Sequence, residues 1–184
     1  MRRVEAVFKH GKPCLVIDGR AYPVDEGAGC YVAVVPINVL KELRLYELPE
    51  GFQVLPVKSL SRGGVSTPLF PGRVLVSGGG SLTYEYWEVP KYYRGFLPVE
   101  DYVFNVVVRV AEQAGFRLVE GGVDEDCVWA LMEAKVDRAL RVDEALSITV
   151  GRLLQALRRF NRSYVASARK LMAKRLCKLL ASLP

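Results

Sequence analysis

Short runs of apolar residues, separated by turn residues, dominate the first quarter of the chain. Residues 4–8, 13–17 and 20–24 are β-branched or aromatic runs, divided by His10-Gly11 and by Asp18-Gly19. Asp-Gly between two such runs is a strong signal for a tight hairpin turn. The pattern therefore predicts three antiparallel strands at the start.

The next segments mix helix, strand and loop signals. Pro36 suits the first position of a short helix that places Ile37, Leu40 and Leu43 on one face. Residues 53–57 read as a strand, and residues 60–72 read as a loop because Gly, Ser and Pro dominate them. Two extended runs then flank Gly78-Gly79-Gly80, which predicts a hairpin rather than a phosphate-binding loop, because no Lys-Ser or Lys-Thr pair follows.

From residue 98 the apolar spacing becomes helical. Residues 98–116 predict a helix that ends at Gly115, with Glu100 and Asp101 in its first turn. Its apolar face comprises Val103, Val106, Val107, Val110 and Ala114. A short strand or connector follows, and residues 124–140 predict a second helix. The apolar face of this second helix comprises Val128, Leu131, Met132, Val136, Ala139 and Leu140.

The final helix is predicted to run from about residue 143 towards Pro184, with Gly151 as a weak point. Apolar side chains recur along it at alternating intervals of four and three, which is the spacing of a seam between packed helices. Core packing within one chain and self-association of two copies would each explain this spacing. The seam that would form a homo-oligomer comprises Leu146, Val150, Leu153, Leu157, Phe160 and Tyr164.

These patterns predict an α+β protein. A β-rich module of antiparallel hairpins and one short helix occupies residues 1–97, and a helical module with a long basic amphipathic helix occupies residues 98–184. The two modules are expected to be separate or to pack as one domain. No apolar run reaches the roughly 18 residues of a membrane span, so we expect a cytoplasmic protein without one. Asn and Gln total three each, a depletion typical of thermophile proteins.

Charge is distributed unevenly along the chain. Residues 1–144 carry 17 basic and 20 acidic side chains, whereas residues 145–184 carry nine basic and none acidic. Arg158 with Arg162, and Lys170 with Lys174, are like-charge pairs four residues apart, which destabilise a helix unless another group compensates. Acids elsewhere in the chain, an external polyanion or an anionic membrane surface could each supply that compensation.

Six aromatic residues lie between residues 84 and 96, with Lys91 and Arg94 among them. They are Tyr84, Tyr86, Trp87, Tyr92, Tyr93 and Phe96. On a strand, Tyr84 and Tyr86 share one face and could stack on bases. Packing in the core is the alternative for Trp87 and for at least half of these rings.

One tripeptide suggests an enzyme. Glu133-Ala134-Lys135, preceded by Glu100 and by Asp124 or Asp126, is similar to the Glu-x-Lys motif of the PD-(D/E)XK nuclease superfamily. The resemblance implies a divalent metal held by carboxylates and a lysine that aids the attacking water. No Pro-Asp precedes the motif, few residues separate either aspartate from Glu133, and the surrounding pattern favours a helix.

We therefore expect a non-enzymatic nucleic-acid-binding protein that prefers single strands and has little sequence specificity. Phosphate contacts are expected from Arg158, Arg159, Arg162, Arg169, Lys170 and Lys174, and base stacking from Tyr84, Tyr86, Tyr92 and Tyr93. The alternatives are an assembly subunit whose basic helix docks on an acidic protein, and the metal-dependent nuclease. No catalytic residue, metal ligand or cofactor is assigned, since His10 is the one histidine and the four cysteines are dispersed.

Overall fold

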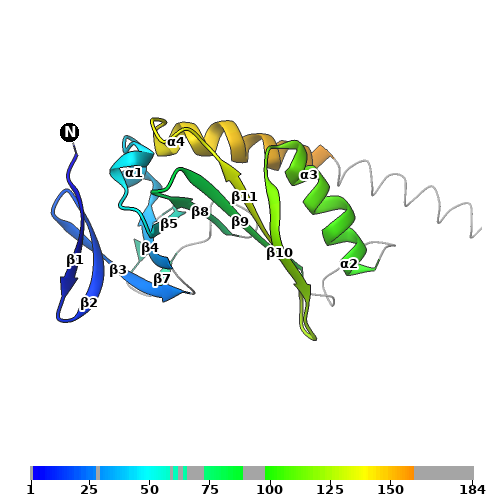
Figure 1. Ribbon diagram of the computed structural model, residues 1–184, viewed down its shortest axis with the longest axis horizontal. Helices are drawn as coiled ribbons and strands as arrows, with labels where there is room; N and C mark the ends of the chain where they lie inside the picture. Colours follow the sequence, from blue (N-terminus) through cyan, green and yellow to red (C-terminus); the bar gives the residue numbers. More distant parts are fainter. Residues whose placement is uncertain are drawn as a thin grey trace, which may run out of the picture.

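The protein is a mixed α+β structure built on one nine-stranded sheet (Figure 1). The computed structural model describes residues 2–27, 30–58, 60–61, 64–65, 73–88 and 98–159. The strand order is β1-β2-β3-β4-β5-β8-β9-β11-β10. Neighbouring strands are antiparallel except for β4 and β5, which run parallel.

The predicted N-terminal meander is confirmed. Strands β1 (Val4–Lys9), β2 (Lys12–Ile17) and β3 (Arg20–Gly27) pair in succession, and two-residue turns join them. Both residues of each turn have positive φ, His10 and Gly11 in the first and Asp18 and Gly19 in the second. Positive φ at both positions gives the twist that antiparallel neighbours need.

The centre of the sheet contains a strand that the pattern did not predict. Strand β4 (Cys30–Pro36) runs parallel to β5 (Phe52–Val57), and the connection between them holds helix α1 (Ile37–Leu40) and the 3-10 turn η1 (Leu45–Glu47). The predicted strand over 53–57 is confirmed, and the predicted helix is only four residues long. The predicted loop contains the short pair β6 (Leu60–Ser61) and β7 (Gly64–Val65).

The hairpin around the three glycines is confirmed. Strands β8 (Arg73–Ser77) and β9 (Ser81–Glu88) are antiparallel neighbours. A Cβ added to Gly78 would clash with the carbonyl oxygen of Leu48, and Gly80 has a φ of +85°. Close backbone packing and turn geometry therefore account for glycine at these two positions.

The helix predicted for residues 98–116 is confirmed. It consists of α2 (Val99–Tyr102), a π-helical turn η3 (Val103–Val107) and α3 (Val108–Gln113), and Gly115 follows its end with a φ of +94°. A second helix begins with α4 (Val142–Ala145), continues through the π-helical turn η4 (Leu146–Val150) and remains helical to residue 159.

The helix predicted for residues 124–140 is wrong. Strand β10 (Arg117–Val123) and strand β11 (Val128–Lys135) form a hairpin, and β11 also pairs with β9. Burial along β11 alternates, with one face fully packed against the core. The residues of that face are Val128, Ala130, Met132 and Ala134. Hydrogen bonding to strands on both sides decides the conformation of a segment whose apolar spacing also fits a helix.

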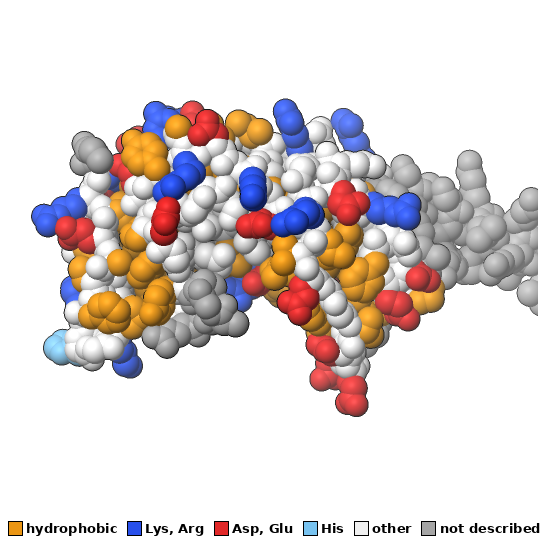
Figure 2. Space-filling view, viewed as in Figure 1, with side chains coloured by type: hydrophobic (Ala, Val, Ile, Leu, Met, Phe, Trp, Pro, Cys, Tyr) orange, Lys and Arg blue, Asp and Glu red, His pale blue; other side chains and the backbone are white. Residues whose placement is uncertain are grey.

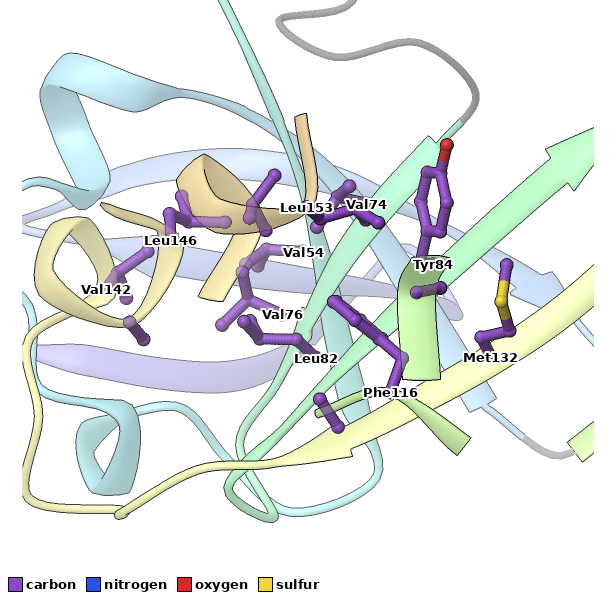
Figure 3. Close-up of a cluster of buried hydrophobic side chains, with 14 of the residues drawn as sticks. Val54, Val74, Val76, Leu82, Tyr84, Phe116, Met132, Val142, Leu146 and Leu153 are labelled. Atoms are coloured by element: carbon purple, nitrogen blue, oxygen red, sulfur yellow. The ribbon is translucent and has the colours of Figure 1, made fainter. Parts of the chain in front are cut away.

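One hydrophobic core joins the two predicted modules. It includes side chains of β2, β4, β5, β8, β9 and β11 together with both helices, from Leu15 to Leu157. Figure 3 shows Leu146 and Leu153 of the second helix beside Val54, Val74 and Val76 of the sheet. Residue 97 is therefore not a boundary of the sheet, because β10 and β11 extend it. Among the described helices, none is both long and apolar enough to cross a membrane.

Candidate nucleic-acid interface

The basic helix is anchored to the body of the protein at its first turn. The backbone N–H of Val142 donates to Leu43 O at 2.8 Å, and the N–H of Leu45 donates to Leu140 O at 2.9 Å. The Glu144 carboxylate accepts from the N–H of Arg141 at 3.0 Å, which caps the helix. Acidic side chains at this end also complement the helix dipole.

The apolar stripe of this helix packs on the sheet of its own chain. Leu146, Val150, Leu153 and Leu157 are each at most 8% exposed and belong to the core. Their spacing therefore reflects core packing, which leaves these four side chains no surface for a second copy. The remaining members of the predicted oligomer seam, Phe160 and Tyr164, lie outside the described residues.

The opposite side of the helix presents arginines to solvent. Arg152, Arg158 and Arg159 are exposed, and none forms an ion pair with an acidic side chain of the described residues. Arg152 and Arg159 are seven residues apart, so on a helix they lie along one line about 10 Å apart. Arg158 and Arg159, two of the six residues predicted to contact phosphate, are therefore on the surface without a described partner, and so is Arg152. Arg162, Arg169, Lys170 and Lys174 lie outside the described residues.

The nearest acids in the sequence have other partners. Asp143 and Glu144 form ion pairs with Arg141 at 3.3 and 3.4 Å, and Glu144 also lies 4.0 Å from Arg44. These pairs all lie at the start of the helix. Within the described residues, no acidic side chain therefore neutralises the three exposed arginines.

The aromatic cluster is divided between the two faces of the sheet. Tyr84 is fully buried, and its ring lies 5.9 Å from that of Phe116, so it is not on the surface where a base could stack. Tyr86 is partly buried and donates a hydrogen bond of 2.6 Å to Glu88. Burial, and for Tyr86 also the adjacent Glu88 carboxylate, raises the pKa of both phenols. Tyr92 and Tyr93 lie outside the described residues.

The other face of the sheet carries a feature that the sequence analysis missed. Trp87 of β9 is 44% exposed and lies directly opposite Trp129 of β11. Beside them, strand β10 and the turn that joins it to β11 carry four exposed acids. These are Glu120, Asp124, Glu125 and Asp126. The apolar spacing from Val128 to Lys135 fits an alternating pattern as well as a helical one, so the sequence alone did not reveal this face.

The residues of the nuclease-like motif are far apart. Glu133 and Lys135 lie on β11, whereas Asp124 and Asp126 lie at the tip of the hairpin. Glu133 is five residues along the extended strand from Val128, a distance of roughly 17 Å. Glu133 instead faces Arg117 across the hairpin at 3.8 Å. In the described part of the chain, no group of three or more His, Cys, Asp or Glu side chains could hold a metal ion.

Comparison with protein-family models, with curated proteins and with solved structures gave no match to this chain.

Proposed function

We propose that this protein binds nucleic acid through the basic face of its C-terminal helix, without catalysing a reaction on it. The observation that carries the proposal is the exposure of Arg152, Arg158 and Arg159 without a described acidic partner. Arginine is suited to phosphate because its planar guanidinium group can donate two parallel hydrogen bonds. Cations that find no partner within the fold are available to a polyanion outside it.

The sequence beyond the described helix carries further positive charge. No acidic residue follows Glu144, and six further Lys and Arg residues lie between residues 160 and 184. Contacts of this kind recognise phosphate groups rather than bases, so little sequence specificity is expected. A preference for single strands would depend on Tyr92 and Tyr93, because Tyr84 is buried and Tyr86 is hydrogen-bonded to Glu88.

Fluorescence anisotropy with labelled oligonucleotides tests the proposal. Single-stranded and duplex DNA and RNA are titrated side by side over a series of salt concentrations. We expect binding at low salt and a linear fall of log affinity with log salt, because phosphate contacts release counterions. Absence of binding to every oligonucleotide at low salt would falsify the proposal.

Two charge-matched variants locate the binding surface. The first changes Arg152, Arg158 and Arg159 to Gln, and the second changes the exposed Lys9, Lys12 and Lys41 to Gln. Both lose three positive charges, so a loss of affinity caused only by net charge would be the same in both. We expect a marked loss of affinity in the first and little change in the second.

A further inference from the structure

The two tryptophans of the chain lie next to each other on one face of the sheet, where Trp87 is exposed and Trp129 is half-buried. Trp87 and Trp129 are its only two tryptophans, and they are directly opposed across β9 and β11. The Trp129 ring lies over Gly122 of β10, where an added Cβ would meet ring atoms at 3.0 Å. The alternation of β11 places Trp129 on the face opposite the helices. An exposed indole face attracts Lys and Arg side chains by cation–π interaction.

Between its two outermost residues, Arg117 and Lys135, the hairpin beside this pair carries only acidic charges. Residues 118–134 contain five acidic side chains and no Lys or Arg. Four of them, Glu120, Asp124, Glu125 and Asp126, are exposed and have no basic partner among the described residues. Figure 2 shows acidic side chains gathered at the tip of this hairpin. We call Trp87, Trp129 and these four acids the acidic tryptophan patch.

The chain itself contains a segment of complementary chemistry. Residues 158–178 carry eight Lys and Arg side chains and no acid. The described start of this segment lies on the helix above the sheet, on the side away from the hairpin tip in Figure 1. The helix that carries Arg158 and Arg159 packs on one face of the sheet, whereas Trp129 lies on the opposite face. A second copy has no such restriction.

We propose that the acidic tryptophan patch of one copy binds the basic C-terminal segment of a second copy. Carboxylates of the hairpin pair with Lys and Arg, and the indole rings hold cationic side chains over their faces. The interaction is electrostatic, so it weakens as salt rises. If the segment also binds nucleic acid, as in the proposed function, then the patch and the nucleic acid compete for the same cations.

Sedimentation velocity of the full chain tests the docking. A patch variant changes Glu120 and Glu125 to Gln and Asp124 and Asp126 to Asn. A charge-matched control changes four exposed acids without a described ion pair, namely Asp25, Glu42, Glu100 and Glu112, to their amides. A segment variant changes the predicted phosphate-contacting residues Arg158, Arg159, Arg162, Arg169, Lys170 and Lys174 to Gln.

At low salt we expect the wild type and the control to self-associate and the patch and segment variants to remain monomeric. Mixing the two monomeric variants should restore association, because one retains the basic segment and the other retains the patch. A monomeric wild type, or a patch variant that associates like the wild type, overturns the proposal. Failure of the mixture to associate also overturns it.

Tryptophan emission provides a second reading at the site itself. As the wild type is concentrated at low salt, emission should shift to shorter wavelength, because docking removes water from Trp87 and Trp129. Unchanged emission contradicts the docking. Oligonucleotide binding separates the two proposals. A wild type that self-associates but binds no oligonucleotide rejects only the proposed function. A wild type that binds oligonucleotide but stays monomeric rejects only the docking. If both hold, added oligonucleotide should dissociate the wild-type assembly.

Discussion

Tyr84 and Tyr86 lie on the same face of β9 but have different hydrogen bonding. The Tyr84 hydroxyl is buried without a hydrogen-bond partner among the described residues, whereas the Tyr86 hydroxyl donates to Glu88 at 2.6 Å. A buried hydroxyl without a partner costs free energy, whereas a hydrogen bond to a charged acceptor contributes more than a neutral one. Two neighbouring phenols therefore have opposite effects on stability.

Removing the two hydroxyl groups one at a time should separate these effects. We expect Tyr86→Phe to lower the free energy of unfolding by about 1 kcal/mol, because it leaves Glu88 without this donor. Tyr84→Phe should leave stability unchanged or raise it. Urea denaturation measures both, and an equal loss in the two variants would contradict the assignment.

Asp18 should make the stability of the protein fall as the pH is lowered. Its carboxylate accepts from Arg2 Nε at 2.7 Å and from the N–H of Arg3 at 3.1 Å, and these bonds lower its pKa. A lowered folded-state pKa adds stability that is present above the unfolded pKa of about 3.9 and is lost as the pH falls through the folded value.

Asp18→Asn should therefore be less stable than the wild type at neutral pH and equally stable in acid. Asn tolerates the positive φ of this turn, so the substitution keeps the backbone geometry. Thermal unfolding of both proteins from pH 7 down to pH 2 measures the difference. A gap that persists at the lowest pH would show that the charge of Asp18 is not its cause.

At the scale of elements, turns and long helices could be predicted because their signals are local. Asp18-Gly19, Gly115 and the valines of 98–116 each specify a conformation through their own backbone or spacing. Strand β11 could not be predicted this way, since Val128 and Met132 fit both a helical and an alternating pattern. Hydrogen bonds to β9 and β10, which are distant in sequence, decide between the two.

Two adjacent glycines in the turn between β8 and β9 should differ in how much an alanine substitution destabilises the protein. Gly78→Ala places a Cβ against the backbone of Leu48 and Pro49, which cannot move as a side chain can. At Gly79 the nearest atom is the Ser77 Oγ, at 3.5 Å. We expect a loss of about 2 kcal/mol or more for Gly78→Ala, typical of overpacking, and little change for Gly79→Ala. Chemical denaturation provides the comparison, and equal stability of the two variants would contradict the close approach.

A second pair of substitutions tests how the basic helix is attached to the sheet. Leu153 is fully buried, whereas Ile148 on the same helix is 49% exposed. Leu153→Ala should cost about 2–5 kcal/mol, because it leaves a cavity in the core. Ile148→Ala should change stability by less than about 0.5 kcal/mol. Similar losses would mean that the helix packs through another face.

At the scale of the whole molecule, exposed charges that have no ion-pair partner among the described residues lie in different places according to their sign. The exposed arginines lie on a helix on one face of the sheet, and the acidic tryptophan patch lies on β9, hairpin β10–β11 and the turn of that hairpin. The basic segment was evident from the sequence, because a run without acids needs no fold to be recognised. The patch was not, since its members come from β9, β10 and β11 and meet only through strand pairing.

The salt dependence of oligonucleotide binding tests the central claim most directly. Each neutralised phosphate contributes about 0.9 to the slope of log affinity against log salt for duplex DNA, and about 0.7 for single strands. Changing Arg152, Arg158 and Arg159 to Gln should therefore reduce the magnitude of the slope by about 2 to 3, whereas the Lys9, Lys12 and Lys41 variant should keep the wild-type slope. An unchanged slope in the arginine variant would show that these side chains do not contact phosphate.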